Sequence, residues 1–248
     1  MDDPVRSRRG FIKALAVGAS ASAVGTMVHA ETGTKPTAQP IRPPISKANP
    51  HAWRFFNREE VRVVEASIAR LIPADELGPG AKEAGVAVFL DTQLAGAWGS
   101  GDNLYRHGPF VAGTAQQGYQ LSFTPAEMFR MGLSKLDEAA KSGYGGGRFA
   151  DLAPTQQDDL LARVEQGKVD FGALPSGVFF AALLDATMEG FFGDPMYGGN
   201  LDMVGWKLVG FPGVYASYAN DIERHGIAWT RLPESIQDGG GHHEGHMS

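Results

Sequence analysis

Apolar residues recur at intervals of three and four over much of residues 57–192, the spacing of one face of an α-helix. The first such stretch follows Asn57 and Glu60, which have the spacing of a capping box, and it stops at Pro73. These signals predict a helix over residues 58–72, and a second is predicted over 81–95. Their apolar stripes are Val61, Val64, Ile68, Leu71 and Ile72, and then Val86, Phe89, Leu90 and Leu94.

Three further helices are predicted downstream. One begins at Thr124-Pro125-Ala126-Glu127, an N-cap followed by proline at the first helical position, and it ends at Gly143. Another begins near Thr155 and stops at Gly167. The last begins near Ser176 and runs through FFAALLDATMEGFF, which is apolar on most faces, so we expect it at the centre of the domain.

No stretch alternates Val, Ile and Thr in the manner of a sizeable sheet. The pattern therefore predicts an all-α fold, a single compact helical domain over residues 51–235 with long ordered loops rich in glycine and aromatic residues. Residues 31–50 contain five prolines and almost no large apolar residue, so we expect a flexible linker there. Residues 236–248 form a tail of glycine and histidine that is equally unable to pack.

Residues 1–30 have the order of a secretory signal: a basic segment, a short apolar stretch and small residues around Ala30. Arg8 and Arg9 are adjacent, with Phe11 and Lys13 after them, which indicates a twin-arginine signal. That route exports folded proteins to the bacterial periplasm, often because they carry a cofactor or travel with a partner. We therefore predict a periplasmic protein that passes through the twin-arginine translocase.

Composition narrows the possible partners and cofactors. The chain has 22 basic and 28 acidic residues, and loss of residues 1–30 would leave 18 and 26, a net charge of −8. An acidic surface argues against nucleic acid as a partner. The chain has no cysteine, which excludes iron–sulfur ligation, c-type haem attachment and thiol nucleophiles. Either it binds something without cysteine, or another chain holds the cofactor.

No convincing catalytic constellation is found. The glycine-rich segments 78–82 and 143–147 lack the context of a phosphate cradle, and the histidines of the tail lie on a flexible stretch that cannot preorganise metal ligands. Asp185 and Glu189 are one helical turn apart and could share a proton or bind an ion. An alternative function, a self-sufficient periplasmic enzyme or metal-binding protein, would bring this pair together with one of His51, His107 or His225.

The most unusual stretch is GFFGDPMYGGNLDMVGW, residues 190–206, together with KLVGFPG at 207–213. Glycine permits sharp turns, and the large rigid aromatic rings are typical of protein–protein anchor surfaces. Some of these rings could instead close the domain's own core, and both interpretations stay open here. The candidate interface residues are Phe191, Phe192, Asp194, Pro195, Met196, Tyr197, Asn200, Trp206 and Phe211.

Three segments, Leu71–Asp75, Gly190–Asn200 and Gly205–Gly213, together resemble the gluconate 2-dehydrogenase subunit 3 family, and the similarity covers roughly residues 55–215. These are small subunits of membrane-associated, FAD-dependent sugar and polyol dehydrogenases. The resemblance implies FAD on a large subunit of the glucose-methanol-choline type and haem on a multihaem cytochrome c subunit. It also implies a non-catalytic chain that escorts the flavoprotein during assembly and export. No catalytic, cofactor-binding or metal-binding residue is carried over to this chain.

Overall fold

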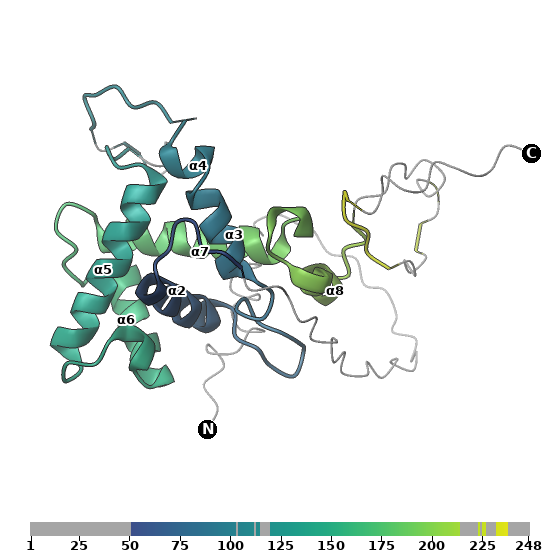
Figure 1. The fold of residues 1–248 in the computed structure, drawn as a ribbon, viewed down its shortest axis with the longest axis horizontal. Coiled ribbons are helices and arrows are strands. Elements are labelled where there is room, and N and C mark those ends of the chain that lie inside the picture. The colour runs from purple at the N-terminus through teal and green to yellow at the C-terminus, as the bar shows by residue number, and fades with distance from the viewer. Residues whose placement is uncertain are drawn as a thin grey trace, which may run out of the picture.

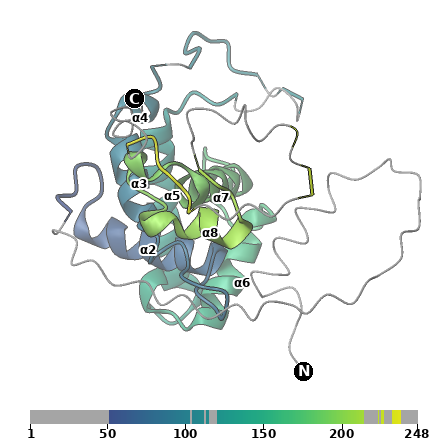
Figure 2. The same ribbon diagram turned by 90° about the vertical axis from the view of Figure 1, so that its right-hand side faces the viewer.

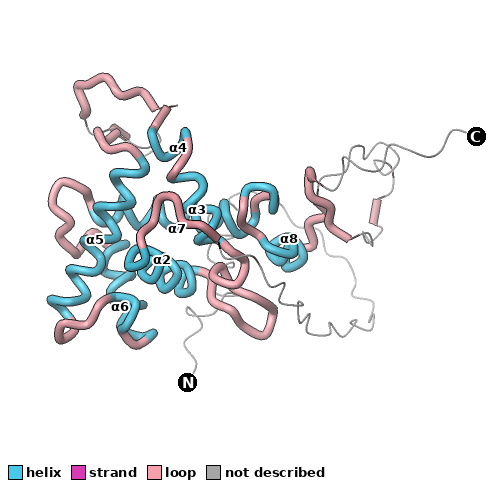
Figure 3. The backbone as a smooth tube through the Cα atoms, viewed as in Figure 1, coloured by secondary structure: helices cyan, strands magenta, loops and turns pink. Residues whose placement is uncertain are grey.

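The computed structural model describes residues 51–102, 104–111, 113–114, 120–213, 223, 225–226 and 232–237. The predicted signal residues Arg8, Arg9, Phe11 and Lys13, the linker over 31–50 and most of the tail lie outside this part. The described residues contain seven α-helices and no strand, which confirms the all-α prediction (Figure 3). None of the helices in the described ranges has the length and apolarity needed to cross a membrane.

The α-helices are α2 (Arg58–Leu71), α3 (Val86–Leu94), α4 (Ala97–Ser100), α5 (Pro125–Gly143), α6 (Pro154–Glu165), α7 (Ser176–Phe192) and α8 (Val204–Val209). Three short 3-10 helices, η2 (Phe149–Asp151), η3 (Pro195–Tyr197) and η4 (Leu201–Met203), lie between them. The five helices expected from the sequence correspond to α2, α3, α5, α6 and α7. Both capping boxes are present, with Asn57 and Thr124 as N-caps.

The start of α3 differs from the predicted start at residue 81. The backbone N–H of Ala81 donates to the carbonyl of Ile72 at 2.9 Å, which ties this turn to the end of α2. Gly85 then has a left-handed conformation with φ of 75°, so the chain turns once more before Val86 enters the helix. Apolar spacing does not register such a turn, because Ala81 and Ala84 are buried as they would be in a helix.

Helix α7 is central, as its composition predicts. It packs against α2, α3, α5, α6 and α8, and it crosses behind α3 in Figure 1. Phe179 lies edge-on to Phe129 of α5, with 6.0 Å between ring centroids. A Cβ atom added to Gly132 of α5 would lie 2.0 Å from the Phe179 ring. The two helices therefore approach as closely as they do because residue 132 has no side chain.

A buried carboxylate fixes the segment that precedes α2. Asp91 of α3 is fully buried and accepts backbone hydrogen bonds from Arg54, Phe55 and Phe56, each at 2.9 Å. The Nε2–H of His51 donates to the same carboxylate at 2.9 Å. Burial raises the pKa of Asp91, but the hydrogen bonds from these four donors outweigh burial and lower the pKa below its ordinary value. One carboxylate thus holds six residues of irregular chain on α3.

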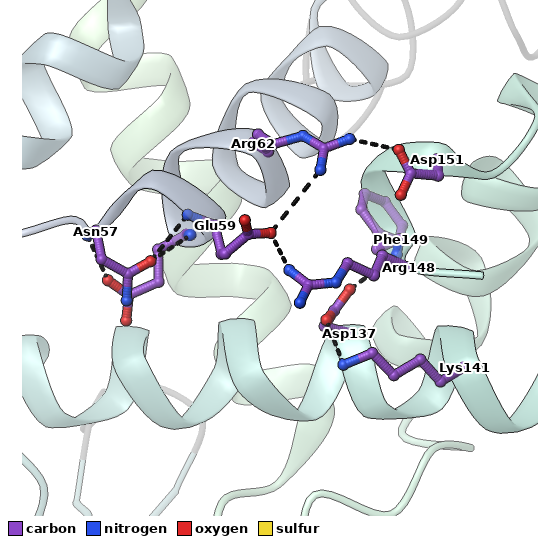
Figure 4. Close-up of polar contacts among 9 residues, drawn as sticks. Asn57, Glu59, Arg62, Asp137, Lys141, Arg148, Phe149 and Asp151 are labelled. Atoms are coloured by element: carbon purple, nitrogen blue, oxygen red, sulfur yellow. Dashed lines mark hydrogen bonds and ion pairs between the residues drawn. The ribbon is translucent and has the colours of Figure 1, made fainter. Parts of the chain in front are cut away.

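Ion pairs on the surface connect α2 with η2, and a hydrogen bond connects η2 with α5 (Figure 4). The guanidinium of Arg148 pairs with Glu59, and that of Arg62 pairs with Asp151. Next to them, the carboxylate of Asp137 accepts a hydrogen bond from the backbone N–H of Phe149 at 2.9 Å. The paired side chains are about half exposed, so each ion pair contributes little free energy. Their effect is to align the three elements.

We predict that Asp91→Asn lowers the free energy of unfolding at pH 7 by about 1–3 kcal/mol, because an amide NH₂ would face backbone N–H groups that now have an acceptor. The pKa of Asp91 is lower in the folded protein than in the unfolded chain. Its stabilisation is therefore complete above the ordinary value of 3.8 and is lost as pH falls through the folded pKa. The difference between variant and wild type should shrink below about pH 4.

Urea denaturation followed by circular dichroism, at pH 7 and at pH 3–4, measures both effects. Asp185→Asn is the matched control, since Asp185 is exposed and the same change there should leave stability nearly unaltered. Equal stability of Asp91→Asn and wild type at pH 7 would contradict the role given to this carboxylate.

We also predict opposite effects for one substitution at two positions of α5. Gly132→Ala should destabilise the protein by about 1–3 kcal/mol, because the added methyl group overlaps the Phe179 ring. Gly143→Ala, at the exposed end of the same helix with open space around it, should stabilise by up to about 1 kcal/mol. Thermal denaturation of both variants gives the comparison, and a stable Gly132→Ala protein would refute the close approach of α5 and α7.

Candidate interface at the end of the central helix

After α7 the chain folds back over the end of that helix through η3, η4 and α8. We call this segment, residues 193–213, the returning chain. Glycine makes this return possible at two positions. A Cβ atom at residue 199 would lie 2.2 Å from the carbonyl oxygen of Gly190, and one at residue 205 would lie 2.0 Å from the carbonyl oxygen of Phe191. Both distances are too short for any other residue. These two glycines therefore allow the backbone of the returning chain to lie directly against the backbone at the end of α7.

Asn200 connects two parts of the returning chain, the residue that follows α7 and the first turn of α8. Its side chain is fully buried, donates to the carbonyl of Gly193 at 2.8 Å and accepts from the backbone N–H of Gly205 at 2.8 Å. Asn200 also has a left-handed backbone with φ of 48°, a conformation that asparagine tolerates better than most residues. Asp202 and Met203 share this conformation, each with φ of 55°. Asn200 thus serves the internal geometry of the loop.

Two of the aromatic residues close the domain's own core. Phe191 is 1% exposed and Trp206 is 4% exposed. The indole Nε1–H of Trp206 donates to the carbonyl of Phe192 at 2.6 Å, which satisfies the polar end of the buried ring. In this structure the two side chains contact the subunit itself and are not presented on its surface.

Asp194 is a second buried carboxylate that holds irregular chain. Its Oδ1 accepts from the backbone N–H of Met196 at 2.9 Å and from the hydroxyl of Ser235 at 2.8 Å, and its Oδ2 accepts from the N–H of Ile236 at 2.9 Å. Asp194 therefore joins η3 to a segment 41 residues further along the chain. Sequence patterns carry no signal for such a long-range partnership.

The remaining candidates reach the surface. Met196, Tyr197 and Phe211 are 39%, 49% and 43% exposed, and Phe192 and Pro195 are half-buried. Leu201 of η4 and Val209 of α8 are exposed as well, although the sequence did not single them out. The short helices η3, η4 and α8 pack in succession at one end of the molecule, where α8 faces the viewer in Figure 2. We call Met196, Tyr197, Leu201, Val209 and Phe211 the apolar patch.

The carboxylate pair is not joined by a histidine in the described part of the chain. Asp185 and Glu189 are exposed on the outer side of α7, where partial burial and the charge of Asp185 raise the pKa of Glu189. His51 instead binds Asp91, and the ring of His107 lies 5.7 Å from that of Tyr105. Among the described residues no three side chains of His, Asp or Glu are arranged to hold a metal ion. The geometry therefore gives no support to the metal-binding alternative.

Comparison with known proteins gives one match. The family model described as gluconate 2-dehydrogenase subunit 3 matches residues 58–213. The match runs from the start of α2 to just beyond α8, so it contains the whole bundle and the returning chain. No curated protein and no solved structure matches the chain. The chain belongs to the gluconate 2-dehydrogenase subunit 3 family and is therefore a small subunit of a multi-subunit dehydrogenase complex.

Proposed function

We propose that this chain is the non-catalytic small subunit of a periplasmic, FAD-dependent sugar or polyol dehydrogenase of the gluconate, fructose, sorbitol or glucose type. In this proposal it binds the flavoprotein large subunit, assists its assembly and escorts it through the twin-arginine translocase. FAD is bound by the large subunit, and haem c by a multihaem cytochrome subunit through which the complex is associated with the membrane.

The observation that carries the proposal is the apolar patch. Five exposed apolar side chains, four from η3, η4 and α8 and the fifth from Phe211 just after α8, lie at one end of the bundle. Groups of exposed apolar residues on a soluble domain commonly mark sites of protein–protein contact. Family membership supports a docking role for this patch, since a subunit of a complex must bury some surface against another chain.

The framework under the patch supports a docking role. Asn200 and Trp206 form hydrogen bonds that hold the returning chain against the end of α7, and Asp194 caps η3. A surface already held in its binding conformation loses little conformational entropy on association, so more of the contact energy appears as affinity. The buried candidate residues therefore set the shape of the loop, and the exposed candidate residues are available to a partner.

We predict that Tyr197→Ala weakens the complex with the flavoprotein by tenfold or more, as truncation of an interface aromatic typically does, while the subunit's own stability stays nearly unchanged. Trp206→Ala should instead destabilise the isolated subunit by about 3–5 kcal/mol, because it removes a buried ring. Binding is measured with the flavoprotein that co-purifies with this chain from its native host, and stability by thermal denaturation.

Tyr105→Ala is the matched control. Tyr105 is 84% exposed and belongs to the loop between α4 and α5. In Figure 1 that loop extends from the end of the bundle opposite α8, so truncation of Tyr105 should leave binding intact. If Tyr105→Ala weakens the complex and Tyr197→Ala does not, the docking surface lies at the other end of the molecule.

A second prediction concerns export. Arg8→Lys combined with Arg9→Lys should leave both this chain and the flavoprotein in the cytoplasm, since the translocase requires the arginine pair and the flavoprotein travels with its escort. Cell fractionation with immunodetection of both chains gives the measurement. Arg6→Lys, outside the pair, is the control that should export normally. Unchanged export of the flavoprotein in the double variant would refute the escort role.

A further inference from the structure

Residues 232–237 lie beyond the end of the family match and are nevertheless docked on the returning chain. The backbone N–H of Glu234 donates to the carbonyl of Pro212 at 3.3 Å, and Glu234 forms a parallel bridge with Gly213. A Cβ atom at residue 213 would lie 2.3 Å from the carbonyl oxygen of Glu234. The two chain segments are therefore in direct backbone contact beside α8.

Asp194 completes the attachment and fixes which side chains face inward. Ser235 is 4% exposed, and its hydroxyl donates to Asp194 Oδ1, the same oxygen that accepts the backbone N–H of Met196. The next residue, Ile236, donates its backbone N–H to Oδ2. Since both segments meet at one carboxylate, Ile236 is brought next to η3, which carries Met196 and Tyr197 of the apolar patch.

The side chain of Ile236 is 47% exposed, although its backbone is held by a buried acceptor. Leu232, four residues earlier, is 79% exposed. The segment thus places its polar serine inside and two aliphatic side chains outside. For an isolated soluble chain this is the less favourable arrangement, because the apolar side chains stay in water. It is the arrangement expected when another protein covers them.

We propose that residues 232–237 form a second part of the docking surface, in which Ile236 and Leu232 contact the flavoprotein next to the apolar patch and Asp194 acts as the positioning residue. This inference rests on the proposed function. The occupant follows from continuity, because Asp194 holds the backbone of Ile236 next to η3, the helix that carries Met196 and Tyr197 of the apolar patch. The family match ends at Gly213, so this part of the surface is an addition beyond the family's matched region.

The test uses the full-length chain and the flavoprotein that co-purifies with it. Ile236→Ala should raise the Kd roughly tenfold, within the range of truncated interface anchors, without changing the thermal stability of the subunit. Gln237→Ala is the matched control, an exposed neighbour whose truncation should leave the Kd unchanged. Ser235→Ala removes the hydroxyl that donates to Asp194 and accepts the backbone N–H of Gln237, and it leaves the side chain of Ile236 intact; it should raise the Kd several-fold.

A double variant separates positioning from simple structural support. If Ser235 acts by placing Ile236, the effects of Ser235→Ala and Ile236→Ala on Kd combine to less than their product. Independent effects that multiply in full would overturn the positioning role. Loss of binding in Ile236→Ala together with a lower melting temperature would also count against it, because the side chain would then serve the fold.

The outcomes distinguish this inference from the proposed function. If Tyr197→Ala weakens the complex and Ile236→Ala does not, the added segment is not part of the interface and the apolar patch alone is. If neither variant affects binding, both the proposed docking surface and its extension are wrong. Weakening by both variants, with no effect of Gln237→Ala, supports both.

Discussion

The structure depends on close backbone approach to helix α7. On one side Gly132 lets α5 approach Phe179, and at the carboxyl end Gly199 and Gly205 let the returning chain lie against the carbonyls of Gly190 and Phe191. A methyl group at any of these positions would meet another atom at 2.0–2.2 Å. The packing density of a protein interior leaves no space to absorb such an overlap. The main role of the glycine-rich stretch after α7 is therefore to pack closely against that helix, and its role as a connecting loop is secondary.

Close approach leaves irregular backbone near the interior, and its polar groups need partners. Three buried polar side chains provide them: Asp91 for residues 51–56, Asn200 for the returning chain, and Asp194 for η3 and residues 235–236. Each one satisfies two or more backbone groups in irregular chain or in the first turn of a short helix. The same hydrogen bonds that remove a desolvation cost also fix the surface above them. The order of the proposed docking surface is thus a consequence of satisfying buried backbone groups.

The helices were predictable from the sequence because their signals are local: apolar spacing, capping boxes and stop residues within a few positions. The roles of the candidate interface residues were not, since Phe191 and Tyr197 are both aromatic neighbours of glycine and only three-dimensional packing makes one buried and the other exposed. The partnership of Asp91 with His51 spans 40 residues, and that of Asp194 with Ser235 spans 41. Hydropathy and spacing carry no information about such pairs.

The way in which folding brings the residues of the apolar patch together bears on the proposed export route. The apolar patch is assembled from three short helices and Phe211, and residues 232–237 are joined to it through contacts that include Asp194, Pro212 and Gly213. In an unfolded chain these side chains would be spread along residues 196–236 and would present no common surface. A subunit that recruits its flavoprotein before crossing the membrane must therefore already be folded when it does so. A translocation route for folded proteins is the one that the proposed docking surface would require, and the twin-arginine pattern at Arg8 and Arg9 predicts that route.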